Sequence, residues 1–265
     1  MIFRVTDIET IPDPSSFTPG EVSYKLGPDG TSVPTEAFPP PQAHRVVAIS
    51  YVDVVFDPTK NPKYAYGGCY TECRWGLTKE SMDEHEEFLL RAWGEAMATP
   101  GVHLVTWNGR TFDMPVIAMR TFKHGLPAKW YYEGKDVRYR YSSEGHLDLM
   151  DFMSDFGACR PMKLNDAAHL IGLPGKTDMS GASIEGIYKK TIEDGLDAES
   201  LVAVWKSVAR YCLQDSIQTA ILFLRSRHLF GKICEETYNQ ALATFANDPT
   251  MDEVLPMDWE SLKLL

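Results

Sequence analysis

The chain lacks a long hydrophobic run and an export signal, which argues against membrane and secreted proteins. Its longest apolar stretch, residues 46–56, is interrupted by Asp53 and is too short to cross a bilayer. The N-terminal residues MIFRVTDIET predict a strand, without the basic and apolar regions that precede the cleavage site of a signal peptide. We therefore expect neither membrane association nor export.

Cysteine is also scarce and irregularly distributed. The five residues are Cys69, Cys73, Cys159, Cys212 and Cys234. An odd, scattered set does not predict a disulfide framework and is typical of the reducing cytoplasm. A zinc site at Cys69, Cys73 and His85 would need a fourth ligand and a tighter spacing. We expect a cytoplasmic protein whose cysteines are ordinary strand or loop residues.

Basic charge is deficient, since 26 Lys and Arg residues stand against 37 Asp and Glu residues and give a formal net charge of −11. A protein that coats duplex DNA neutralises phosphates and is basic, so the charge disfavours this class. An enzyme whose carboxylates are balanced by bound Mg²⁺ or Mn²⁺ is not excluded, because it needs only a local basic path for the nucleic acid.

The chain of 265 residues, of which 44% are hydrophobic, is long enough to bury one large core. We expect a single domain over residues 1–247 and a loose C-terminal tail over residues 248–265. Residues 12–44 contain eight of the 17 prolines and show little periodicity. This composition predicts a long loop or arm inserted into the domain, and such loops are usually functional or disordered.

Hydrophobic periodicity predicts strands first and helices later. An antiparallel meander is expected from strands at residues 2–6 and 45–56 and a weaker one at 63–75. A buried strand at 102–107 separates helices at 80–97 and 113–124. Further helical patterns cover about residues 163–172, 183–194, 197–230 and 233–247, and a bend or break is expected near the middle of residues 197–230. This order suits an α/β fold in which helices flank a mixed sheet.

Three acidic residues lie at strand ends. Asp7 and Glu9 are two apart on the first predicted strand and therefore share one face of the sheet. Adjacent carboxylates repel unless a cation or proton lies between them; the alternative is a solvated strand end. Asp113 follows the strand at 102–107, after a turn at Asn108 and Gly109. Such turns present residues to ligand crevices, although Asp113 would equally cap a helix.

Tyr211 and Asp215 are four residues apart on the longest predicted helix, so they share one of its faces. The surrounding residues are largely apolar. An Asp that faces a core needs a partner. A metal ion would serve, and so would the neighbouring Arg210.

Taken together and in order, these residues resemble the three motifs of the DEDD nucleases. The motifs stand here as DIET (7–10), NGRTFD (108–113) and YCLQD (211–215). One subclass has His five residues before the last Asp, where this chain has Arg210. The other has Tyr four residues before it, where this chain has Tyr211. The chain therefore resembles the Tyr subclass, which includes the proofreading domains of family A and B DNA polymerases and ribonuclease D.

Four further segments, at residues 39–50, 145–153, 163–176 and 211–225, resemble a stand-alone family of predicted 3′–5′ exonucleases related to the proofreading domain of family B polymerases. The resemblance implies a ribonuclease H-like fold, with a mixed five-stranded sheet and helices on both faces. It also implies two divalent cations, Mg²⁺ or Mn²⁺. Asp7 would bridge both ions, Glu9 and Asp215 would complete one site, Asp113 would help to hold the other, and Tyr211 would orient the attacking water.

A basic and aromatic segment predicts a path for a single strand. Residues 110–140 contain seven basic and three acidic residues, interleaved with aromatic ones. Positive charge follows phosphates and aromatic rings stack on bases; the alternative is an ordinary solvated loop. We expect substrate contacts at Asn108, Phe112, Trp130, Lys135, Arg138 and Arg140. Asp148 and Asp151 are expected as structural polar residues near a sheet edge, with a place near the active site as the alternative for Asp148.

The substrate we expect is the 3′ end of DNA, with single strands favoured by the acidic net charge. A 3′–5′ exoribonuclease is the alternative, because the same chemistry attacks phosphate and only contacts to the 2′-hydroxyl separate the two. A second alternative is a non-catalytic nucleic-acid-binding module. A third is an accessory proofreading subunit, in which the proline-rich arm would dock a replication or repair partner.

Overall fold

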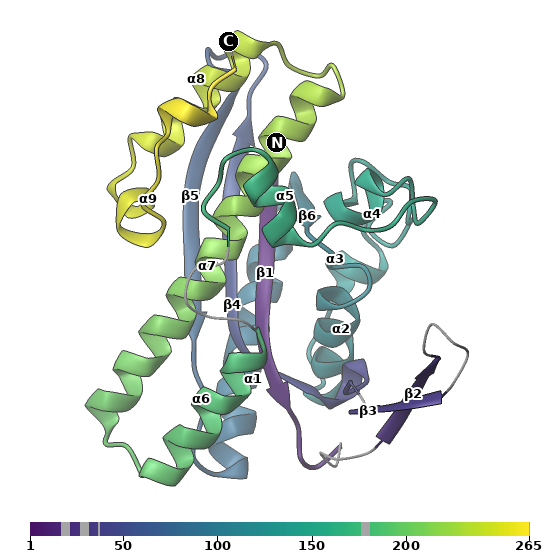
Figure 1. Cartoon of the computed structure of the whole chain (residues 1–265), viewed down its shortest axis with the longest axis vertical. Helices are drawn as coiled ribbons and strands as arrows, with labels where there is room; N and C mark the ends of the chain where they lie inside the picture. The colour runs from purple at the N-terminus through teal and green to yellow at the C-terminus, as the bar shows by residue number, and fades with distance from the viewer. Residues whose placement is uncertain (17–21, 27–31, 37, 176–180, 265) are drawn as a thin grey trace.

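A mixed five-stranded sheet forms the centre of the molecule (Figure 1). The computed structural model describes residues 1–16, 22–26, 32–36, 38–175 and 181–264. The strand order is β5-β4-β1-β6-β7. β1 pairs antiparallel with β4 and β4 with β5, whereas β1–β6 and β6–β7 are parallel. The strands are β1 (Ile2–Pro12), β4 (His44–Phe56), β5 (Tyr64–Cys73), β6 (Val102–Thr106) and β7 (His146–Asp148).

Helices cover both faces of this sheet. They are α1 (Lys79–Met97), α2 (Asp113–Lys123), α3 (Lys129–Tyr132), α4 (Leu149–Met153), α5 (Leu164–Leu170), α6 (Gly181–Asp194), α7 (Ala198–Leu229), α8 (Glu235–Ala246) and α9 (Pro249–Val254), with short 3₁₀ helices η1 (Pro41–Ala43) and η2 (Glu260–Leu262). None of the helices in the described part of the chain is both long and apolar enough to span a membrane. The expected α/β fold, a mixed five-stranded sheet with helices on both faces, is confirmed.

The alternation of side chains along β1 explains the two helical layers. Phe3 and Val5 pack into the core beneath α7 and α8, where the ring of Phe3 lies 4.8 Å from that of Phe223. Ile8 points to the other face and packs against α1 and α2. Because side chains on a strand alternate with period two, Asp7 and Glu9 lie on the α7 face with Phe3 and Val5.

α7 is one continuous helix of 32 residues. Of the two alternatives expected near the middle of residues 197–230, a bend or a break, the break is therefore wrong. The side chain of Asp197 caps its first turn by accepting a hydrogen bond of 2.8 Å from the backbone N–H of Ser200. No Gly or Pro interrupts the helix. Its middle section packs against β1, β4 and β5, and Figure 1 shows it crossing the sheet.

Two other expectations need correction. Residues 12–44 are not a plain loop, because their described part contains a hairpin of β2 (Val22–Leu26) and β3 (Ser32–Glu36) in addition to η1; residues 17–21, 27–31 and 37 lie outside the described residues. Residues 248–265 are not a loose tail. Met251 and Leu262 are fully buried in the core beneath α7 and α8, and the hydroxyl of Tyr238 donates to the carbonyl of Leu262 at 3.2 Å.

Candidate active site

Three carboxylates meet between β1 and α7. One ligand oxygen from each of Asp7, Glu9 and Asp215 lies within 4.8 Å of the other two. Glu9 is 7% exposed and Asp215 is 4% exposed. The pairing of β1 with β4 shifts register between Glu9 and Thr10, an irregularity of the kind that redirects side chains at functional sites. Three partly desolvated negative charges this close repel one another, and a bound cation relieves the repulsion.

Asp113 adds a fourth acidic group to this region. It is the first residue of α2 and is 4% exposed, and the backbone N–H of Ile8 on β1 acts to lower its pKa. Burial raises the pKa of Asp113 to about 7, and the negative charges of Asp148 and Asp215 act in the same direction. Around neutral pH the carboxyl of Asp113 is therefore divided between its protonated and ionised forms, and nearby positive charge would favour the ionised form.

Asp148 holds the turn that delivers Asp113. Its carboxylate accepts the backbone N–H groups of Asn108 and Arg110, each at 2.9 Å, and it also caps α4 through Met150 at 3.1 Å. Asn108 has a left-handed backbone with φ of 69°. A Cβ on Gly109 would lie 2.5 Å from the side chain of Thr106, so the turn needs glycine there. Asp148 is thus a positioning residue for this turn.

Tyr211 lies beside the carboxylates. Burial raises the pKa of its hydroxyl, and the charges of Asp215, Glu9 and Asp7 raise it further. The phenol therefore stays protonated and is available as a hydrogen-bond donor. Cys212 is a contact that the sequence did not predict. Its sulfur lies 3.6 Å from Oδ2 and 3.5 Å from the carbonyl oxygen of Asp7, and nothing in the spacing of the cysteines indicated it.

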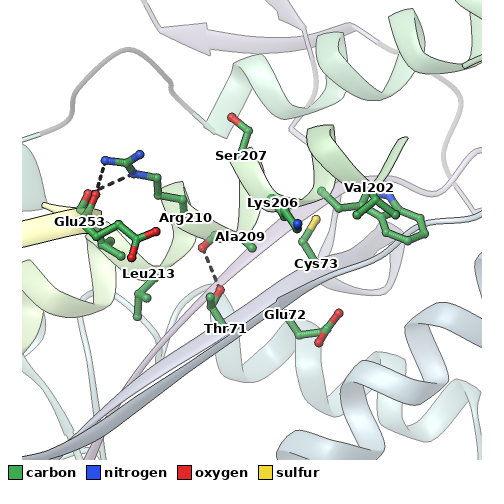
Figure 2. Close-up of a pocket in the computed structure, with 12 residues that line it drawn as sticks. Thr71, Glu72, Cys73, Val202, Lys206, Ser207, Ala209, Arg210, Leu213 and Glu253 are labelled. Carbon is green, nitrogen blue, oxygen red and sulfur yellow. Dashed lines mark hydrogen bonds between the residues drawn. The ribbon is translucent and has the colours of Figure 1, made fainter. Parts of the chain in front are cut away.

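Arg210 reaches toward Glu253, as Figure 2 shows. Its guanidinium donates to the backbone carbonyls of Glu253 and Val254, the latter at 3.3 Å. Thr71 donates to the carbonyl of Ala209 at 2.8 Å, and both residues line the same groove as Arg210. This groove of about 650 Å³ is lined by residues of β5, α7 and α9, and none of the four site carboxylates lines it. Arg210 is therefore committed to α9 and is not the partner of Asp215.

The expected substrate-binding residues lie in two places. Asn108 and Phe112 belong to the turn that ends at Asp113, next to the site. Trp130 packs edge-on against Trp93, with ring centres 4.9 Å apart. Lys135 and Trp130 both line a cavity of about 270 Å³. The guanidinium of Arg138 lies 5.1 Å from the ring of Tyr132. Arg140 forms a two-point ion pair with Asp151, with distances of 2.7 and 2.8 Å.

A second acidic cluster has a different character. Asp83, Glu86 and His124 also approach one another closely enough to share a metal ion. Their charges are already balanced, however, because the cluster forms ion pairs with Arg45, Arg120 and Lys123. We therefore regard it as a structural ion-pair network and not as a metal site.

Comparison with solved structures shows the same fold in a polymerase. The family B DNA polymerase from the archaeon Pyrobaculum calidifontis is similar over 97% of this chain, with a TM-score of 0.52 and 15% identity. This chain spans only 27% of the polymerase. The metal-free and zinc-bound E. coli exonuclease I–single-stranded DNA complexes match at 13% identity with TM-scores of 0.36 and 0.38, over 62% and 88% of this chain and 34% and 45% of theirs.

Comparison with curated proteins finds no match. A family model described as "Predicted 3'-5' exonuclease related to the exonuclease domain of PolB" matches residues 36–250. Asp7 and Glu9 precede this range, so their place in the site depends on the geometry of β1 and α7. The match covers most of the chain and confirms the expected relationship. The chain belongs to the family of predicted 3′–5′ exonucleases related to the exonuclease domain of family B DNA polymerases.

Proposed function

We propose that the protein is a metal-dependent exonuclease that hydrolyses phosphodiester bonds from the 3′ end of single-stranded DNA. The observation that carries this proposal is the cluster of Asp7, Glu9 and Asp215 within 4.8 Å, beside Tyr211. Family membership supports the reaction class and its direction. The acidic net charge of −11 favours a single strand that enters by a local path over a duplex bound along its length.

Carboxylate oxygens are the ligands that hard divalent cations prefer, so the donor set fits Mg²⁺ or Mn²⁺. Asp7, Glu9, Asp113 and Asp215 would hold two such ions. When bound, a pair of ions lowers the pKa of the attacking water and stabilises charge on the scissile phosphate and the leaving oxygen. The chain contributes carboxylates that are already gathered before metal arrives, which reduces the reorganisation that binding requires.

Tyr211 would position the attacking water. A hydroxyl with a raised pKa remains neutral, so it can hydrogen-bond the water without adding negative charge next to the phosphate. The turn from Asn108 to Phe112, held by Asp148, would place the terminal nucleotide against the site. We assign these residues to orientation of the reacting groups, which converts binding energy into rate.

The direct test is a 5′-labelled single-stranded DNA incubated with the protein and Mg²⁺ or Mn²⁺. A ladder that shortens from the 3′ end, and that EDTA and Asp7→Asn both abolish, is the expected result. Asp194→Asn is the matched control, because Asp194 is an exposed residue at the end of α6. A ladder on RNA of the same sequence, without one on DNA, would replace the proposal with the exoribonuclease. Binding without any cleavage would favour a non-catalytic module.

A further inference from the structure

Three aromatic rings gather next to the active site at the end of the proline-rich arm. The ring of Phe38 lies 4.9 Å from that of His44 and 6.0 Å from that of Phe112. His44 and Phe112 meet edge to face at 5.0 Å. Phe38 is nevertheless 74% exposed. His44 and Phe112 therefore support the ring of Phe38 from the protein side, while Phe38 itself lies open to solvent.

The middle ring of this group is fixed in place. Nε2 of His44 lies 2.8 Å from the carbonyl of Pro39, which can only accept, so Nε2 carries a proton. Nδ1 lies 3.0 Å from the hydroxyl of Thr10 and can accept its hydrogen bond. Burial lowers the pKa of His44, which keeps the imidazole neutral near pH 7. A neutral ring with both nitrogens engaged is a rigid support for Phe38.

Residues of this aromatic group are sequence neighbours of the site carboxylates. Thr10, which holds His44, follows Glu9 on β1, and Phe112 immediately precedes Asp113 on α2. An exposed aromatic ring costs free energy in water unless something covers it. A nucleotide bound at these carboxylates carries a flat base within a few ångströms of its phosphate, and aromatic rings beside a nuclease site are suited to such bases.

We propose that Phe38, supported by His44 and Phe112, stacks against one base of the substrate strand near its 3′ end. This inference rests on the proposed function, and it gives part of the residue 12–44 arm a role in substrate binding. Stacking uses the π-face that every base possesses, so the contact would secure the strand without selecting its sequence.

The test is a binding cycle between Phe38 and individual bases. Affinity is measured by fluorescence anisotropy with a 5′-labelled oligothymidylate in Ca²⁺, which takes the same oxygen ligands as Mg²⁺, and the length of the oligonucleotide is checked after titration. Matching oligonucleotides carry one abasic residue at each position near the 3′ end in turn. The proteins are wild type, Phe38→Ala, Phe38→Trp and the control Phe122→Ala. Phe122 lies on α2 and is 83% exposed.

Phe38→Ala is expected to weaken binding of the intact strand roughly 5- to 150-fold, which corresponds to the loss of one stacked base. Phe38→Trp should retain affinity, and Phe122→Ala should not change it. An abasic residue at the position of the stacked base should weaken binding to the wild type. The same abasic residue should not change binding to Phe38→Ala, which has already lost the stacking ring. Abasic effects that are equal in the two proteins at every position would overturn the inference.

A parallel cleavage assay in Mn²⁺ separates the two proposals. Cleavage from the 3′ end without coupling between Phe38 and any base would remove the stacking role and leave the proposed exonuclease intact. Coupling without cleavage would support the stacking role and remove the exonuclease. Absence of both binding and cleavage would overturn the two together.

Discussion

Arg120 and Glu86 form a two-point ion pair in the interior, with Nε–Oε1 and Nη2–Oε2 distances of 2.7 and 2.5 Å. Each side chain is 1% exposed. The same guanidinium donates to Asp13 at 2.8 Å and to the carbonyl of Gln42 at 3.0 Å. Asp13 and Gln42 lie at the two ends of the residue 12–44 arm. The pair therefore fastens both ends of the arm to α1 and α2, next to the residues that support Phe38.

Arg120→Met is expected to destabilise the fold strongly, because it leaves the carboxylates of Glu86 and Asp13 buried without their main partner. Removing one member of a buried ion pair costs about 3–5 kcal/mol. Denaturant unfolding measures the loss. The control is Arg91→Met, which breaks an exposed pair with Glu87 and should change stability by less than about 1 kcal/mol. Equal losses in the two variants would contradict the anchoring role of Arg120.

Asp215→Asn should abolish activity without destabilising the metal-free protein. Asp7, Glu9 and Asp215 lie within 4.8 Å, so in EDTA their mutual repulsion opposes folding and an amide relieves it. Loss of a residue that only hydrogen-bonds a metal ligand lowers activity by up to ~100-fold. Loss of a ligand itself should therefore lower activity by at least that factor. Thermal unfolding in EDTA and in Mn²⁺ measures both effects. A variant that melts well below wild type in EDTA would instead give Asp215 a structural role.

Metal binding should weaken as the pH falls below 7. Burial raises the pKa of Asp113 to about 7, so a metal must displace a proton below that value, and one released proton costs about tenfold in affinity per pH unit. In the metal-free protein, the raised pKa contributes stability at low pH that is lost as the pH rises from 3.8 to about 7. Metal should therefore raise the melting temperature more at pH 8 than at pH 6.

Calorimetric titration of Mn²⁺ at several pH values checks this dependence. Asp113→Asn removes the titrating group. The affinity of this variant for Mn²⁺ should be lower than that of the wild type, and it should vary less with pH between 6 and 8. An affinity of the wild type that is constant over this range would show that Asp113 does not exchange its proton for metal.

Much of the fold followed from local spacing. Strand alternation placed Asp7 and Glu9 on one face of the first strand, and helical spacing placed Tyr211 and Asp215 on one face of the longest helix. The meander of β5, β4 and β1 was predictable because each strand is a separate apolar and β-branched run. These features depend on neighbours within a few residues, which a single sequence displays.

The features that were missed depend on contacts between distant segments. Residues 211–224 of α7 are buried on every side, so the helical period of apolar and polar residues disappears there and resembles a break. The burial of Leu262 requires α7 and α8 to be in place. The anchor between Asp13 and Arg120 joins residues 107 positions apart, and Asp148 reaches the turn at Asn108 across 40 positions. No local pattern encodes these pairs.

Tyr211→Phe should lower kcat and leave KM nearly unchanged, because the hydroxyl would act on the attacking water and not on the bound strand. The loss of one hydrogen bond in a charged site corresponds to about 1.5–3 kcal/mol, or roughly a 10- to 100-fold lower rate. Arg210→Gln is the neighbouring control. Its side chain binds the carbonyls of Glu253 and Val254, so its loss should lower stability and spare kcat. A reduced kcat in Arg210→Gln together with a normal one in Tyr211→Phe would reverse these assignments. The fifth residue before Asp215, and not the fourth, would then serve the reaction.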